Sequence, residues 1–256
     1  MFLLIVFSQA QAQKDTTSSR KKPKTVLRNA VIFGFSYSRQ TPVGELAKRF
    51  GANSGLGVTA GYKFGRNLLV QGGVQVIFSG RVRENQVFDS MTGSTGYLID
   101  VNGSYTQVHI YERGYNWHVD FGKIIPVNKF EKNSGILITG GMGFMQHKMK
   151  FIYSRTYVPQ LDNGYYKGYD RLTNGFMLRG FIGYQRIDPK GMLNFICGVE
   201  LLDGFTRNRR EFNYDTRVKD DHLRNDLLIG ARIGVMITLQ GRQAGTKKGD
   251  EERFFE

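Results

Sequence analysis

Apolar and polar residues alternate with a period of two from Leu227 to Leu239. Every odd-numbered position in this stretch is apolar, whereas the even-numbered positions include Gly230, Arg232 and Thr238. Successive side chains of a β-strand point to opposite faces, so the pattern predicts a strand with one apolar face. A helix would place Arg232 within an apolar stripe, which disfavours the helical interpretation.

The same alternation recurs along the chain and predicts eight strands in all. Their connections alternate between short turns, such as Gly65-Arg66-Asn67, and long polar loops, such as residues 82–114. Short turns at one end and long loops at the other are typical of outer-membrane barrels. The predicted strands are residues 31–38, 55–64, 68–81, 115–122, 135–151, 176–185, 193–201 and 227–239.

The strands are long enough to cross a bilayer, which takes about 9–11 tilted residues. We therefore predict an all-β fold: an eight-stranded antiparallel up-and-down transmembrane β-barrel with short periplasmic turns and long extracellular loops. A soluble lipocalin-like barrel is the alternative, since it also has eight strands. In that barrel the two faces would be exchanged, and Arg179, Glu200 and Arg232 would lie on the surface. The glycine-rich second face, the loop asymmetry and the amino terminus favour the membrane.

Composition agrees with a barrel that carries an export signal. The chain has 256 residues, a formal charge of +14 and a mean hydropathy of −0.35. Its opening MFLLIVFSQAQAQ combines an apolar run with a small-x-small cleavage site at Ala10-Gln11-Ala12. A buried N-terminal strand is the alternative for this opening. The expected organisation is a signal peptide at 1–12, a basic flexible periplasmic leader at 13–30, the barrel at 31–239 and a flexible periplasmic tail at 240–256.

Two loop stretches carry a resemblance to known proteins. They are Gly168 to Gly175 (GYDRLTNG) and Gly204 to Arg210 (GFTRNRR). Both resemble loops of small outer-membrane proteins of Bacteroidota, and the architecture is similar to the OmpA-type transmembrane barrel. The resemblance implies a location in the bacterial outer membrane and brings no catalytic residues with it. No segment after Leu239 is long enough for the peptidoglycan-binding domain of full-length OmpA-type proteins.

Ionisable residues fall on the inward strand faces. If Asp188 pairs with Gly191 across a turn, paired residue numbers sum to 379 and Arg179 lies opposite Glu200. An eight-stranded interior is just wide enough for side chains to fill it. We predict a structural plug, with a gated proton or ion path as the alternative, because buried charges are normally paired. The predicted lumen cluster is Arg179, Glu200, Arg232, His118 and Asp120.

An enzyme would need a nucleophile, a base and an orienting acid within hydrogen-bond reach. His109, His147 and His222 lie in or near loops, but no spacing ties them to such partners. Four scattered histidines and the lone Cys197 give no metal-ligand spacing. We predict no catalytic residue, no metal and no cofactor.

The long loops are rich in Tyr, Arg and Asn, and Arg and Tyr are favoured at interfaces. We predict an accessory subunit of an export or assembly complex of the cell envelope, with a general structural barrel or a lipid-modifying enzyme at the rim as alternatives. Loop cations could instead neutralise the phosphates of surrounding lipopolysaccharide. Nucleic acid is not expected to be a partner of an exported barrel. The candidate contact residues are Arg207, Arg209, Arg210, Tyr165, Tyr166 and Tyr169.

Overall fold

A computed structural model describes residues 29–92, 96–128, 131–153, 157–162, 164–188 and 194–240. The expected signal peptide, residues 13–28 of the expected leader and residues 241–256 of the expected tail lie outside these ranges. The predicted turn at Asp188 also lies outside them from Pro189 to Gly191. No helix in the described residues is long and apolar enough to span a membrane.

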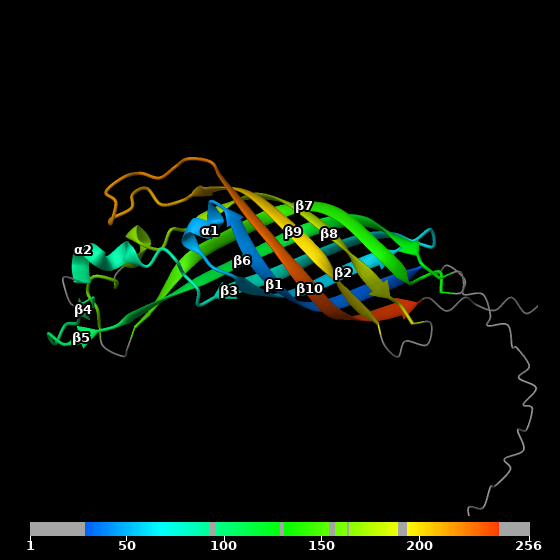
Figure 1. Ribbon diagram of the computed structural model, residues 1–256, viewed down its shortest axis with the longest axis horizontal. Coiled ribbons are helices and arrows are strands. Elements are labelled where there is room, and N and C mark those ends of the chain that lie inside the picture. Colours follow the sequence, from blue (N-terminus) through cyan, green and yellow to red (C-terminus); the bar gives the residue numbers. More distant parts are fainter. Residues whose placement is uncertain are drawn as a thin grey trace, which may run out of the picture.

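Eight antiparallel strands form a closed ring in the order β1-β10-β9-β8-β7-β6-β3-β2 (Figure 1). Chain neighbours pair around the ring, and β1 closes it by pairing with β10 along its whole length. The predicted eight-stranded all-β fold is confirmed. The barrel strands are β1 (Ala30–Gly44), β2 (Asn53–Lys63), β3 (Leu68–Ser79), β6 (Val108–Pro126), β7 (Gly135–Tyr153), β8 (Thr173–Arg186), β9 (Phe195–Asn208) and β10 (Arg224–Gln240).

Most strands extend further than the apolar alternation predicts, mainly towards the long loops. β6 begins at Val108 rather than at residue 115, β9 continues to Asn208, and β1 continues through Pro42 to Gly44. Pairing continues here into segments that no longer need an apolar outer face. The predicted strands ended where that face ended, so their upper boundaries were wrong.

One row of paired residues shows how the sheet is staggered. Starting from Val235 of β10 and passing once around the ring, the row returns to β10 at Asn225, ten residues away. Such a stagger tilts the strands against the barrel axis, typically by about 35–45°. The residues of this row, all on the outer face, are Val235, Phe35, Val58, Val74, Trp117, Phe144, Phe176 and Phe205.

The outer face of the barrel is an apolar belt. Phe35, Trp117 and Ile182 are 52%, 50% and 56% exposed, although each is a large apolar side chain in mid-strand. A closed ring leaves no strand edge unpaired, and this exterior is the surface that a bilayer covers. The soluble lipocalin-like alternative is excluded, because Arg179, Glu200 and Arg232 lie inside the barrel and only 1–5% of each is exposed.

The long connections fold into a lobe beyond the ring, at the left of Figure 1. The short connections and the described chain ends lie at the other end of the barrel. The lobe has short elements of its own. These are α1 (Leu46–Arg49), η1 (Gln86–Phe88), α2 (Asp89–Thr92), β4 (Leu98–Ile99), β5 (Tyr105–Thr106) and η3 (Tyr165–Gly168).

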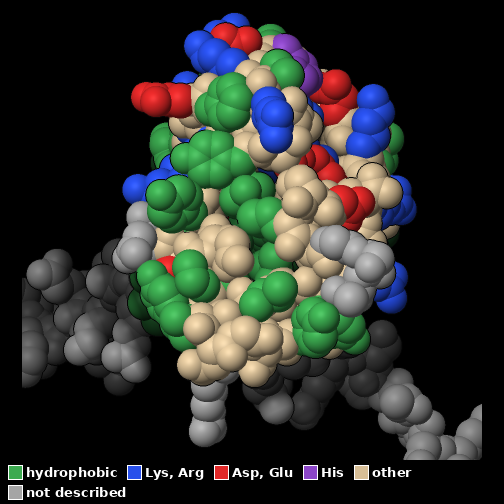
Figure 2. All heavy atoms as spheres, turned by 90° about the vertical axis from the view of Figure 1, so that its left-hand side faces the viewer, with side chains coloured by type: hydrophobic (Ala, Val, Ile, Leu, Met, Phe, Trp, Pro, Cys, Tyr) green, Lys and Arg blue, Asp and Glu red, His purple; other side chains and the backbone are tan. Residues whose placement is uncertain are grey.

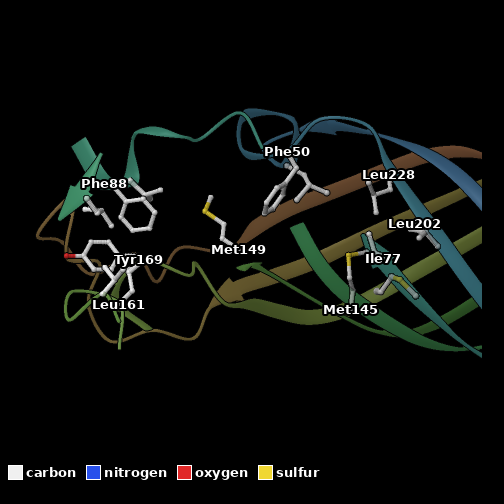
Figure 3. Packing of buried hydrophobic residues seen from close by; sticks show 14 residues of the cluster. Phe50, Ile77, Phe88, Met145, Met149, Leu161, Tyr169, Leu202 and Leu228 are labelled. Carbon is white, nitrogen blue, oxygen red and sulfur yellow. The ribbon is translucent and has the colours of Figure 1, made fainter. Parts of the chain in front are cut away.

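Two apolar clusters fill the interior. The smaller one includes Leu69, Ile124 and Leu137 and lies towards the short turns. The larger one begins in the lumen at Leu202 and continues outward to Tyr169 in the lobe. Figure 3 shows its side chains following one another from the barrel into the lobe. The lobe and the barrel therefore share one core.

We predict that a charge in the belt destabilises the barrel. Ile182→Arg places a guanidinium on the outer face of mid-strand β8, which should lower the free energy of unfolding by about 2–4 kcal/mol. Urea titration of the protein folded into phospholipid vesicles measures this value. Ile99→Arg is the control, since Ile99 is similarly exposed but lies in the lobe. Equal effects of the two variants would contradict the placement of the belt.

Candidate functional site

The interior of the barrel holds one charge network centred on Arg179. Its Nη2 donates to Glu200 Oε2 at 3.0 Å, and its Nη1 donates to Asp120 Oδ2. These residues come from β8, β9 and β6, and all three are buried. The two carboxylates therefore share a single guanidinium inside the barrel.

The strand register that suggested the Arg179–Glu200 pair was wrong by two residues. Paired numbers of β8 and β9 sum to 381 rather than 379, so Arg179 lies opposite Leu202 and Glu200 lies opposite Phe181. A shift of two residues keeps every side chain on the same face of the sheet. The long Arg179 side chain spans the difference and reaches Glu200 diagonally.

Arg232 lies in the lumen with the predicted cluster but forms no ion pair with Glu200. Within the described residues no carboxylate lies within 4.0 Å of its guanidinium. Its Cζ instead lies 5.7 Å from the centre of the Phe181 ring. Gly183 and Gly198 make room for that ring, because a Cβ on either would meet Phe181 Cζ at 2.6 and 2.8 Å.

Uncharged amides complete the network, and they could not be singled out from the sequence. Gln40 Nε2 donates to Glu200 Oε1 at 2.7 Å, and Asn116 Nδ2 donates to Gln75 Oε1 at 2.8 Å. His118 Nδ1 lies 3.1 Å from Asn116 Oδ1, and its Nε2 lies 3.8 Å from Asp120. The only feature of the sequence that pointed to these residues was their position on the inward strand faces.

This interior leaves little free volume. The cavity beside Arg232 measures about 10 Å³, which is roughly the space that one water molecule needs. Chemically, the network can hold charges in place across the lumen.

A second network joins the long loops above the barrel. Arg49 of α1 lies 3.2 Å from Asp220 and 3.5 Å from Glu84, which belong to two other loops. Arg171 lies 3.0 Å from the same Glu84 and also pairs with Asp215. Arg49 and Arg171 are both buried. These pairs connect all four long loops. They could not be predicted from the sequence, because each pair joins distant segments.

The charges in this loop network affect one another. Burial alone would raise the pKa of Asp220, but the guanidinium groups of Arg224 and Arg49 hold that pKa below its usual 3.8. Burial, together with the nearby Arg224, lowers the pKa of Arg49. Asp220 therefore stays ionised to an unusually low pH and continues to hold the loops together.

A cleft of about 650 Å³ opens beside this network. Buried Arg49 and Arg171 contribute to its lining, together with exposed side chains such as Lys219 and Asp221. Both signs of charge line the cleft, and most of the arginines are already paired. The cleft therefore shows no strong preference for a ligand of one charge.

The three candidate arginines do not share one surface. Arg207 belongs to β9 and points outward, and Arg209 donates from Nε to Asn174 Oδ1 at 2.6 Å over the outer wall of β8. Arg210 instead turns into the lobe and pairs through two nitrogens with Asp170. Of the three candidate arginines, Arg207 and Arg209 therefore lie on the outer wall and Arg210 lies in the lobe.

The three candidate tyrosines also separate. Tyr165 and Tyr166 are exposed, at 57% and 38%. Tyr169 is only 8% exposed and packs against the rings of Phe88 and Tyr214, so it belongs to the core and cannot be a contact residue.

The histidines occupy four different environments. His147 is buried and bonded to Asp226 at 2.8 Å, and His118 lies in the lumen network. His109 is exposed near the start of β6, and His222 lies at the rim, 2.7 Å from Asp220. Among the described residues, no group of three metal-ligating side chains is close enough to hold a metal ion.

Comparison with known proteins finds similarity in shape only. A scan against family models gives no match, and a search of curated proteins also gives none. Neisserial surface protein A is similar over 82% of this chain and 99% of its own, with 9% identity and a TM-score of 0.42. Ail of Yersinia pestis is similar over 83% of this chain and 100% of its own, with 11% identity and a TM-score of 0.41. OprG of Pseudomonas aeruginosa is similar over 84% of this chain and 98% of its own, with 11% identity and a TM-score of 0.36.

The barrel's own architecture defines its class. A single chain closes eight antiparallel strands, exposes an apolar belt and separates short turns from long loops, which is the design of bacterial outer-membrane barrels. The protein is a small eight-stranded β-barrel of the bacterial outer membrane.

We predict that Arg179 and Glu200 are energetically coupled. Removing the carboxylate by Glu200→Ala should cost roughly 3–5 kcal/mol, because it leaves buried Arg179 with one carboxylate fewer. The same change should cost less in an Arg179→Ala background. Urea unfolding in vesicles measures the free energy of unfolding of each variant in this double-mutant cycle. Arg232→Ala should couple more weakly to Glu200→Ala, because Arg232 packs on Phe181. Additive effects at Arg179 and Glu200, or a stable pore in planar bilayers, would refute the closed network.

We also predict that acid loosens the loop network. The folded-state pKa of Asp220 is depressed, so its stabilising effect is fully present above about pH 3.8 and is lost as the pH falls through the folded value. Hydrogen exchange of residues 209–223, corrected for intrinsic rates, should be constant from pH 7 to 5 and rise several-fold below pH 4. Asp220→Asn should raise exchange already at pH 7 and reduce the acid step. Asp221→Asn is the control, since Asp221 is 69% exposed.

Proposed function

We propose that this protein is a non-enzymatic accessory subunit of a cell-envelope complex for export or assembly, and that its lobe binds a protein partner. The barrel anchors the lobe in the outer membrane. The similarity of two loop stretches to Bacteroidota proteins stays a prediction about its source.

The observation that carries this proposal is an aromatic surface on the β4–β5 hairpin. Tyr97, Ile99 and Tyr105 are 44%, 49% and 66% exposed. Ile99 and Tyr105 are cross-strand partners, and the rings of Tyr97 and Tyr105 are 6.2 Å apart. Val101 is also exposed and bonds through its backbone to Tyr157. Exposed apolar side chains gathered in this way mark interaction surfaces.

Hydrophobic side chains spread over the middle and lower parts of the lobe's end face in Figure 2, and Figure 1 places β4 and β5 in the lower part. Lys and Arg side chains lie mainly around the upper and outer parts of the same view. An apolar centre with a polar rim is the usual anatomy of a protein interface.

The lobe is held in one arrangement before any partner binds. Phe88 packs against Phe151 of β7 at 4.9 Å, and the Arg49 and Arg171 pairs connect the loops. A surface that is already ordered loses less conformational entropy on binding. The filled lumen supports the same proposal, because transport would need a path that the Arg179 network occupies. We infer that this network acts as a structural plug.

The test compares complexes purified from the native host in mild detergent. We expect a discrete complex on native gels that Ile99→Ser/Tyr105→Ser reduces at least tenfold, because the variant removes the apolar centre of the hairpin surface. Tyr165→Ser/Tyr166→Ser tests the exposed part of η3 in the same way. Loss of the complex in this variant would extend the interaction surface to η3.

Two controls make the result specific. Each variant must still show the heat-dependent shift of a folded barrel on SDS gels. Removal of residues 241–256 should leave the complex intact. Loss of the complex on trimming this tail, together with no effect of either lobe variant, would contradict the proposal.

A further inference from the structure

Two cations face each other on the outer wall of the barrel. Arg113 of β6 and Lys148 of β7 are cross-strand partners on the outward face, since their neighbours Glu112 and Met149 are buried inside. Directly opposite residues have Cβ atoms only about 4.5–5.5 Å apart, and like charges there are destabilising. Such a pair therefore gains stability from an anion between or above the two charges.

More cations surround this pair. Lys150 faces outward two residues beyond Lys148, and Arg207 and Arg209 face outward on the far side of β8. We call Arg113, Lys148, Lys150, Arg207 and Arg209 the basic wall.

Within the described part of the chain, the basic wall has no salt-bridge partner. Among the described residues no carboxylate lies within 4.0 Å of any of its five members. Arg113 lies 5.2 Å over the Tyr111 ring and donates to the Glu112 carbonyl at 2.7 Å. Arg209 donates to the neutral amide of Asn174. These contacts orient the side chains without neutralising them.

The wall lies just above the apolar belt. On β6, Trp117 of the belt lies four residues below Arg113. Phe144 likewise lies four residues below Lys148 on β7, and Phe205 lies two residues below Arg207 on β9. At about 3.3 Å per residue and a tilt of about 40°, these steps raise the cations about 5–10 Å above the aromatic row. The headgroup layer of a bilayer begins at the edge of its hydrocarbon core and is about 5–8 Å thick on each side.

We propose that the basic wall binds the phosphate groups of a phosphorylated glycolipid in the outer leaflet. The phosphates lie between Arg113, Lys148 and Arg207, while the acyl chains follow the aromatic side chains below. A lipid is the favoured source because the wall faces the bilayer and continues directly into the belt. This inference rests on the membrane location, but it uses the wall and not the hairpin surface of the lobe, so the two can fail separately.

Trp117 provides a reporter, since it is the only tryptophan in the chain and lies directly below the wall. The full chain is folded into phosphatidylcholine vesicles that contain 10 mol% of one brominated-chain lipid. The lipid is bisphosphorylated lipid A, dephosphorylated lipid A or phosphatidylcholine. We expect bisphosphorylated lipid A to quench Trp117 at least threefold more than brominated phosphatidylcholine does at the same mole fraction. The dephosphorylated form should show no such excess.

The variant Arg113→Gln/Lys148→Gln should reduce the excess quenching to the phosphatidylcholine level. Its matched control is Arg66→Gln/Lys132→Gln, which removes the same charge from exposed residues in connections at the short-turn end and should keep the excess. Folding of each variant is checked by its heat-dependent gel shift.

Two outcomes would overturn the proposal. One is equal quenching by the two forms of lipid A. The other is complete loss of the excess with 10 mM inorganic phosphate, which would show that free phosphate is the ligand.

Discussion

Closure of the sheet is the constraint on which the rest of this structure depends. Inside a bilayer each unpaired backbone N–H or C=O group costs several kcal/mol, so every strand must have two partners. The first strand and the last strand supply the final pairing, from Ala30 with Gln240 to Gly44 with Asp226. Once the ring is closed, the period of two fixes which side chains face lipid and which face the lumen.

Closure creates a second problem, because an eight-stranded ring encloses a space that must be filled. Apolar clusters fill it at both ends, and the charges of Arg179, Asp120 and Glu200 lie between them. The inward glycines are part of the same solution. A Cβ at Gly141 would collide with the carboxylate of Asp120, so this small residue gives the carboxylate room beside Arg179.

The parts of the fold that could be predicted are those set by local periodicity. Alternation identified eight strands and placed Arg179, Glu200 and Arg232 on the inward face. It could not fix the register of β8 and β9, because a shift of two residues preserves both faces. It also could not find the Arg171–Glu84 pair or separate buried Tyr169 from exposed Tyr165. Those outcomes depend on contacts between loops that are far apart in the sequence.

The extension of the strands beyond the belt determines how the outer part of the molecule is organised. From Arg207 to Arg210 the period of two continues past the apolar face, so alternate side chains still separate to opposite sides. Arg207 and Arg209 remain on the wall, whereas Asn208 and Arg210 turn inward, where Asn208 Oδ1 accepts from the Arg210 backbone and Arg210 binds Asp170. Four consecutive residues thereby contribute to two surfaces. Because strand geometry makes this separation, a lipid-facing wall and an internally cross-linked lobe can arise from one short, highly basic segment.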